Sequence, residues 1–148
     1  MNDIFAQFFK NKILIITISG WLIAQTIKVV IGTIRFKRFD FRWFVGTGGM
    51  PSSHATGASC LGTSIGKNCG YDSVYFALAA AFALVVMFDA QGVRRATGRQ
   101  ARILNKITDD IYWKGRIKDG QLRELIGHTP MEVIMGFLLG VVIAFVAG

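Results

Sequence analysis

The chain has 148 residues, of which 52% are hydrophobic, and it carries a formal net charge of +8. Its length is that of a single domain, residues 1–148. The apolar content excludes a disordered basic tail. Strongly basic chains often bind nucleic acid, but long apolar runs argue against a nucleic-acid partner here. Long uncharged runs that alternate with basic clusters instead predict an integral membrane protein.

The first part of the chain predicts an interfacial helix and then a membrane crossing. Residues 2–12 are amphipathic and rich in phenylalanine, which is typical of a helix that lies at the membrane interface. Residues 13–34, about 22 in number, can cross a ~30 Å hydrocarbon core, and their one charge is Lys28. Basic and aromatic residues over 35–44 then predict an interfacial belt.

Three later apolar segments predict three further crossings. Residues 52–67 form a weaker span that is rich in small residues, whereas residues 74–88 are alanine-rich and uncharged. Residues 97–121 are polar with apolar positions at helical spacing and predict an amphipathic surface helix, and residues 130–146 form the last span. The predicted fold class is all-α: an integral membrane helical bundle of about four transmembrane helices, an N-terminal interfacial helix and an amphipathic surface helix.

The crossings assign the polar segments to two sides of the membrane. If the first span ends on one side, then Arg35, the stretch 48–55, Arg94 and His128 all lie on that side, so both histidines reach one face. Of the 17 lysines and arginines, only Lys10, Lys12, Lys28 and Lys67 lie elsewhere. By the positive-inside rule, the face with the histidines is cytoplasmic.

The stretch 48–55, GGMPSSHA, has the residue types of a phosphate site. Glycines let the backbone approach a bound group. Pro51 suits the first position of a helix, so the amides of Ser52 and Ser53 are expected in its first turn, where free N–H groups attract anions. An ordinary loop with a helix cap is the alternative interpretation.

Cations on this face are candidate phosphate ligands. Lys28 and Arg35 are seven positions apart and share one helix face, with Lys28 ~10 Å deeper. A charged lysine below the membrane interface is costly and therefore indicates a functional residue. The alternative is that its long side chain extends along the helix and keeps the ammonium in water. Arg94 and Arg95 directly follow the third span. They either set the orientation of the chain in the membrane or bind phosphate oxygens through their guanidinium groups.

His128 precedes a predicted capping box. Thr129 is a good N-cap, Pro130 fits the first helical position and Glu132 is three residues after the cap. The box accounts for Thr129 and Glu132 but not for His128. Glu132 is also four residues after His128, where it can accept the ring N–H and raise the nucleophilicity of the other nitrogen. Phosphate monoester hydrolysis needs a nucleophile, an acid and positioned positive charge, and this face has candidates for all three.

Three motifs in order resemble those of the type 2 phosphatidic acid phosphatases and the related vanadium haloperoxidases. Lys28 opens a K-x6-R, residues 51–54 read P-S-S-H and His128 opens an H-x3-E, against the family's K-x6-R-P, P-S-G-H and S-R-x5-H-x3-D. The strings GGMPSSHA, FDAQGVRR and LRELIGHTPMEV are similar to a small, divergent bacterial branch. The resemblance implies that His128 forms a phosphohistidine, that Glu132 orients it and that His54 protonates the leaving alkoxide, without a metal or cofactor.

The chain departs from the family's pattern at several positions. Phe36 replaces a proline, Glu132 replaces an aspartate and the serine–arginine pair of the third motif is absent at its spacing. Other arginines are therefore expected to supply the missing contacts. The expected phosphate ligands are Lys28, Arg35, Ser52, Ser53, Arg94 and Arg95, with Arg123 in reserve.

Four spans are also fewer than the six usual in that family. The chain has two G-x-x-x-G faces, at Gly62 and Gly66 and at Gly136 and Gly140, which permit close contact between helices. Self-association into a homo-oligomer through these small-residue faces is one way to complete the bundle.

These observations predict a metal-independent lipid-phosphate phosphatase, a multi-pass protein of the bacterial inner (plasma) membrane with a cytoplasmic-facing site. The candidate substrates are phosphatidylglycerophosphate, phosphatidate and a polyprenyl phosphate or diphosphate. Two other hypotheses remain open. A non-enzymatic lipid-phosphate binder or translocator predicts binding without phosphate release, and a structural membrane subunit predicts that both histidines are replaceable.

Overall fold

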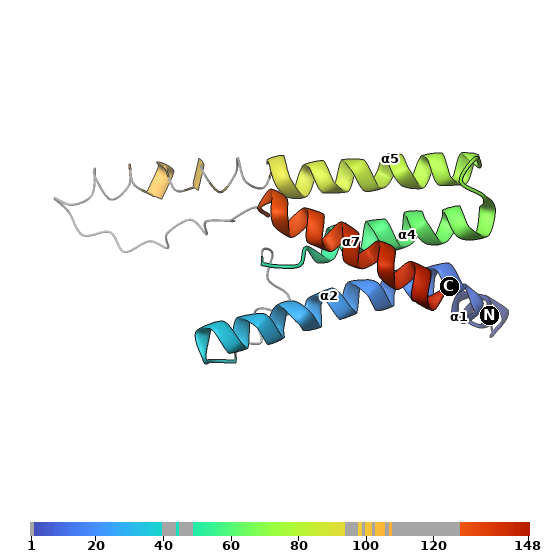
Figure 1. Ribbon diagram of the computed structural model, residues 1–148, viewed down its shortest axis with the longest axis horizontal. Helices are drawn as coiled ribbons and strands as arrows, with labels where there is room; N and C mark the ends of the chain where they lie inside the picture. The colour runs from blue at the N-terminus through green and yellow to red at the C-terminus, as the bar shows by residue number, and fades with distance from the viewer. Residues whose placement is uncertain are drawn as a thin grey trace.

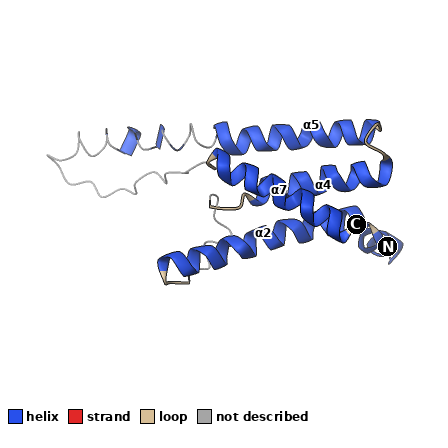
Figure 2. Ribbon diagram, viewed as in Figure 1, coloured by secondary structure: helices blue, strands red, loops and turns tan. Residues whose placement is uncertain are grey.

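The computed structural model describes residues 2–39, 44, 49–93, 98, 100–101, 103–105, 107 and 128–148. Within these residues every regular element is a helix, as Figure 2 shows. The elements are α1 (Asn2–Lys10), α2 (Lys12–Phe36), α4 (Ser53–Cys69), α5 (Val74–Phe88), the π-helical turn η1 (Asp89–Val93) and α7 (Pro130–Ala147). The all-α prediction is confirmed, while most of the surface helix expected over 97–121 lies outside the described residues.

Local sequence determines where the long helices begin. Asn11 caps α2 and Ser73 caps α5, each through a side-chain oxygen that accepts from the amide three residues later, at 3.1 and 3.2 Å. The capping box predicted for Thr129 and Glu132 is present at the start of α7. These caps satisfy N–H groups that have no partner inside their own helix.

α4 lies at the centre of the bundle and packs against α2, α5 and α7 (Figure 1). Its buried positions are mostly glycine, alanine, serine and threonine. Because α2, α5 and α7 all pack closely against α4, the side chains of α4 at these contacts are small. Three helices are long and apolar enough to cross a membrane, Lys12–Phe36, Val74–Gly92 and Pro130–Ala147, and the 17-residue α4 is not among them. The expected count of four crossings is therefore not confirmed by length and composition.

α4 and α7 run parallel and approach each other closely. The Thr56 hydroxyl donates to the carbonyl oxygen of Gly136 at 3.0 Å, and the Cys60 thiol donates to that of Gly140 at 3.2 Å. A Cβ added at either glycine would collide with atoms of α4. α4 therefore occupies this G-x-x-x-G face within one chain, so the face is closed to a second copy. The homo-oligomer stays a prediction that needs another surface.

α2 and α5 run in the opposite direction to α4 and α7. Gly20, in the first half of α2, contacts the middle of α4, whereas Lys28, in the second half, contacts Gly49 just before α4. The amide of His128, before α7, donates to the carbonyl oxygen of Ala90, after α5, at 3.1 Å. The ends of α2 and α5 thus lie with the starts of α4 and α7, and the chain termini lie at the other end of the bundle (Figure 1).

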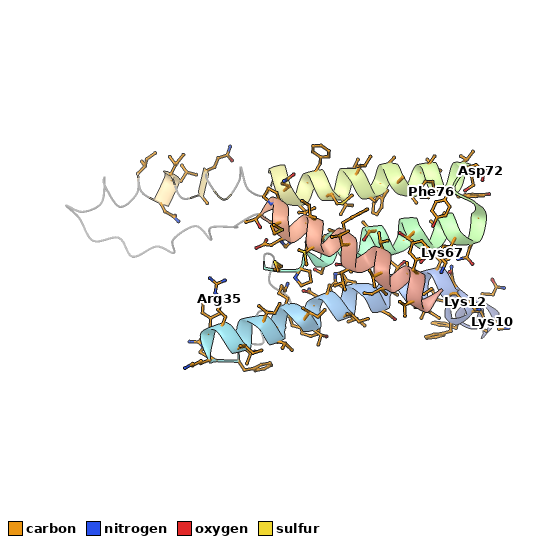
Figure 3. All side chains as sticks on the ribbon, in the orientation of Figure 1. Lys10, Lys12, Arg35, Lys67, Asp72 and Phe76 are labelled. Atoms are coloured by element: carbon orange, nitrogen blue, oxygen red, sulfur yellow. The ribbon has the colours of Figure 1, made fainter. Side chains whose placement is uncertain are left out.

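The short helix α1 lies at the end with the chain termini. It exposes three phenylalanines, Phe5, Phe8 and Phe9, by 65%, 51% and 71%. Lys10, Lys12 and Lys67 gather at the same end of the molecule (Figure 3). Exposed aromatic rings beside lysines are typical of a helix at the membrane interface, and the interfacial position expected from the sequence stays a prediction.

The connection from α2 to α4 turns back along α2. α2 ends at Phe36, and Lys37 follows with a left-handed φ of 49°. The carbonyl oxygen of Phe44 then accepts a hydrogen bond from Gln25 Nε2 at 2.9 Å. Gln25 is eleven residues before the end of α2, ~16 Å along its axis. The segment expected as an interfacial belt therefore reaches the middle of α2 at Phe44, and α2 extends beyond the starts of α4 and α7 (Figure 1).

Candidate functional site

Two histidines from distant parts of the sequence face each other at one end of the bundle. His54 lies in the first turn of α4, and His128 lies two residues before α7. Their ring centroids are 6.2 Å apart, and the ring planes are inclined by 61°. His128 is only 2% exposed, and His54 is half-buried. The structure therefore brings together the two residues that the crossing pattern assigns to one side.

Backbone hydrogen bonds hold the segments around the histidines. The Ser52 amide donates to the carbonyl oxygen of Glu132 at 3.0 Å, which joins the start of α4 to the start of α7. The His128 amide donates to Ala90 in the π-helical turn, a kind of turn that is common at functional sites. Ala55, Ala90 and Val133, one from each of these segments, form a small buried core. The positions of the two rings are thus determined by three chain segments together.

Glu132 orients the ring of His128. Its Oε2 lies 3.0 Å from His128 Nδ1 and also accepts the amide of Thr129 at 3.1 Å. Because a carboxylate can only accept, Nδ1 carries the ring proton, and in the neutral imidazole the lone pair is then on Nε2. His128 Nε2 is buried and has no hydrogen-bond partner among the described residues. One carboxylate oxygen therefore completes the helix cap and orients the His128 ring.

The structure corrects the role expected for the Ser52 amide. α4 begins at Ser53, and Ser52 is its N-cap, with a side-chain oxygen that accepts from Ala55 at 3.4 Å. Pro51 therefore precedes the cap instead of occupying the first helical position. The Ser52 amide already donates to Glu132, so it is not available to an anion. Ser53 supplies the first amide of the helix, and its hydroxyl bonds to no other residue in the described part of the chain.

Lys28 lies beneath the glycine segment that leads to α4. The residue is 8% exposed. Gly49 has a φ of +90°, and a Cβ on it would lie 3.1 Å from both Cγ and Cδ of Lys28. Glycine is needed here for its backbone conformation and for the close approach. The covered stem argues against a lysine that simply snorkels along a lipid-facing surface.

The arginines expected at the site are less well placed. Arg35 is exposed and lies ~10 Å further along α2 than Lys28. Its guanidinium carbon is 5.8 Å from the ring centroid of Phe36. Figure 3 places it on the part of α2 that extends beyond the other helices. Arg35 is thus at the rim, and Arg94, Arg95 and Arg123 lie outside the described residues.

Sequence reasoning missed Gln25. A carboxamide three residues before Lys28, inside an otherwise apolar span, was the available signal.

The described residues contain no group of three or more histidine, cysteine, aspartate or glutamate side chains placed to hold a metal ion. The described site therefore consists of imidazoles, one carboxylate, one lysine and hydroxyl groups.

Comparisons with known proteins cover almost the whole chain. A family model described as the divergent PAP2 family matches residues 9–143, a range that includes Lys28, both histidines and Glu132. The chain is 38% identical over 151 residues to the uncharacterized membrane protein YuiD of Bacillus subtilis (strain 168), a match that spans 95% of this chain and 96% of that protein. No solved structure matches the chain.

Proposed function

Because this chain belongs to the divergent PAP2 family and is a membrane protein, we propose that it is a phosphatase that hydrolyses a phosphomonoester or diphosphate of a membrane lipid. The observation that carries the proposal is the pairing of His54 with His128, whose Nδ1 is bound by Glu132 and whose Nε2 has no described partner. Lys28 adds a buried positive charge at the same end of the bundle. A nucleophile, an acid and a cation are the groups that phosphate monoester hydrolysis requires.

The proposed reaction has two steps. His128 Nε2 attacks phosphorus while the bond from phosphorus to the lipid oxygen breaks, and protonated His54 gives its proton to that oxygen. The phosphorylated ring is cationic, and the carboxylate of Glu132 stabilises it. Water then attacks phosphorus, His54 takes the water's proton, and the phosphorus–nitrogen bond breaks to release inorganic phosphate.

The substrate candidates are phosphatidylglycerophosphate, phosphatidate and polyprenyl phosphate or diphosphate. The test is phosphate release from each lipid by the purified protein in detergent, with and without a chelator, together with binding of each lipid. Release from at least one of these lipids supports the proposal. Binding without release supports a non-enzymatic binder or translocator, and the absence of both contradicts any lipid-phosphate function.

Replacing Glu132 by glutamine is expected to keep the helix cap and to impair catalysis. The amide oxygen of glutamine can still accept the Thr129 amide, but it has no charge to stabilise the phosphorylated ring. We expect turnover to fall by about 100-fold or more.

Thr129→Ala is the matched control, because Thr129 belongs to the same cap without touching the ring. It should lower the free energy of unfolding by about 1 kcal/mol while turnover per folded molecule stays close to wild type. Both quantities are measured from phosphate release and thermal unfolding. Equal losses of turnover in the two variants would show that Glu132 acts only through the cap.

We also propose that the site faces the cytoplasm, because 13 of the 17 lysines and arginines were assigned to that side and only Lys10, Lys12, Lys28 and Lys67 were not. Cys69 is exposed at the far end of α4, and Cys60 is buried. A membrane-impermeant maleimide should therefore label Cys69 in intact bacteria, and Cys69→Ser should abolish the labelling. Labelling that requires permeabilised cells would reverse the orientation.

A further inference from the structure

Gln25 is a buried polar residue in the middle of an apolar helix. It is 4% exposed and lies in α2, the longest of the helices that are apolar enough to cross a membrane. A carboxamide in such a helix is costly unless its donors and acceptor are satisfied. The nearby hydroxyls of Thr26 and Thr33 solve this problem within α2, since each donates to the carbonyl oxygen four residues earlier. Gln25 instead reaches outside its own helix.

The one described partner of Gln25 is the backbone of the returning connection. Its Nε2 donates to the carbonyl oxygen of Phe44 at 2.9 Å, across nineteen positions of sequence. This bond holds the connection against α2 at a level ~16 Å from the helix end.

The same connection contacts α2 a second time, at Lys28, about one helical turn after Gln25. Five residues after Phe44, the backbone of Gly49 lies against the stem of Lys28, and a Cβ there would be 3.1 Å from Cγ and from Cδ. Gln25 and Lys28 are three residues apart, so they are neighbours on the surface of α2. The hydrogen bond at Gln25 and the close contact at Lys28 therefore hold the two ends of one short segment.

The other half of the carboxamide has no donor among the described residues. Because Nε2 is committed to Phe44, the amide orientation is determined and Oε1 is the remaining acceptor. Gln25 Oε1 is buried, and no donor among the described residues reaches it. A buried acceptor without a donor destabilises the folded state. An apolar residue of similar size could not donate to Phe44, so within the described part of the chain the bond to Phe44 is what distinguishes Gln25.

We infer that Gln25 is a positioning residue for the phosphate-binding lysine: by holding Phe44, it keeps Gly49 closed over the stem of Lys28 and thereby aims the ammonium at the bound phosphate. The inference rests on the proposed function for the role of Lys28 and goes beyond it by assigning a residue outside the three motifs. Gln25 touches no reacting atom, and it acts through its bond to Phe44 and the contact of Gly49 with Lys28.

A double-mutant cycle on phosphate binding tests this inference. Binding of inorganic phosphate is measured by calorimetry in detergent for wild type, Gln25→Leu, Lys28→Met and the double variant. Gln25→Leu should weaken binding by about tenfold in the wild-type background and by less than about twofold when Lys28 is already replaced. Thr26→Ala, whose hydroxyl bonds only within α2, should bind phosphate as wild type does.

Two further variants keep the outcome interpretable. Gln25→Met has nearly the length of glutamine and should behave as Gln25→Leu does, with little change in melting temperature. Gly49→Ala, which acts on the same contact from the other side, should weaken binding without adding to the effect of Lys28→Met. Equal weakening by Gln25→Leu in both backgrounds, or unchanged binding in both glutamine variants, overturns the inference.

The readout separates this inference from the proposed phosphatase activity. Phosphate binding with the expected coupling supports the positioning role even when no lipid phosphate is hydrolysed, and that result would contradict the phosphatase alone. Hydrolysis of a lipid phosphate, together with additive effects of Gln25→Leu and Lys28→Met on phosphate binding, would contradict the positioning role alone. A wild-type protein that binds no inorganic phosphate overturns the role assigned to Gln25.

Discussion

Replacing His128 by alanine is expected to reduce phosphate release from a lipid phosphate by more than about 10⁴-fold. The nitrogen removed is Nε2, on the side of the ring away from Glu132, and it is buried without a partner in the described part of the site. Phosphate binding should be largely retained, because the variant keeps Lys28 and the start of α4. The measurements are steady-state release and phosphate binding on the same preparation. Retained release would contradict the proposed nucleophile.

His54→Ala separates the roles of the two rings. If His54 protonates the leaving oxygen, its loss should slow release from an alkyl phosphate by about 10²–10⁴-fold. An aryl phosphate such as para-nitrophenyl phosphate has a leaving group that needs no proton, so its hydrolysis should be affected far less. Wild type and His54→Ala should also form an acid-labile phosphoenzyme that His128→Ala lacks. Equal effects of His54→Ala on both substrates would contradict a role as the acid.

Gly136→Ala is expected to destabilise the bundle strongly. The added Cβ would collide with the carbonyl oxygen of Ser52 and lie 3.1 Å from both the Ser52 nitrogen and Ala55 Cβ. These atoms belong to the beginning of α4, so they cannot yield as a flexible side chain would. We expect a loss of about 3 kcal/mol in the free energy of unfolding, or failure to fold.

Gly62→Ala is the matched control for this prediction. Gly62 is buried in α4, yet nothing lies within 4 Å of the position of an added Cβ. Alanine should therefore be neutral or stabilise the helix by about 0.5–1 kcal/mol. Thermal unfolding in the same detergent compares the two variants with wild type. Equal stability of Gly136→Ala and wild type would contradict the close contact of α4 with α7.

Several features of the site could be predicted because they are local. The cap at Thr129 and the bond from Glu132 to His128 both lie within four residues, so helix geometry determines them. The meeting of His54 with His128 is not local in sequence. It follows from the alternating direction of the helices, which the apolar runs already indicate.

Other features depend on which atoms meet across the bundle. The Ser52 amide was expected to bind an anion, but α7 supplies the carbonyl oxygen of Glu132 as its partner. Arg35 was expected with Lys28, yet it lies at the rim because the connection turns back and α4 starts well below the end of α2. No pattern within a single helix carries this information.

The sequence by itself determined the apolar helices, their caps, the end of the bundle that holds the histidines and the pairing of His128 with Glu132. Each of these follows from hydropathy, turn chemistry or spacing along one helix. Only the tertiary structure decided that α4 is enclosed by three helices, that Gly136 and Gly140 serve a contact within the chain, and that Gln25 donates to Phe44 while Gly49 lies against Lys28. These depend on close packing between distant segments, where a single Cβ or one hydrogen bond selects among arrangements that the sequence pattern allows equally.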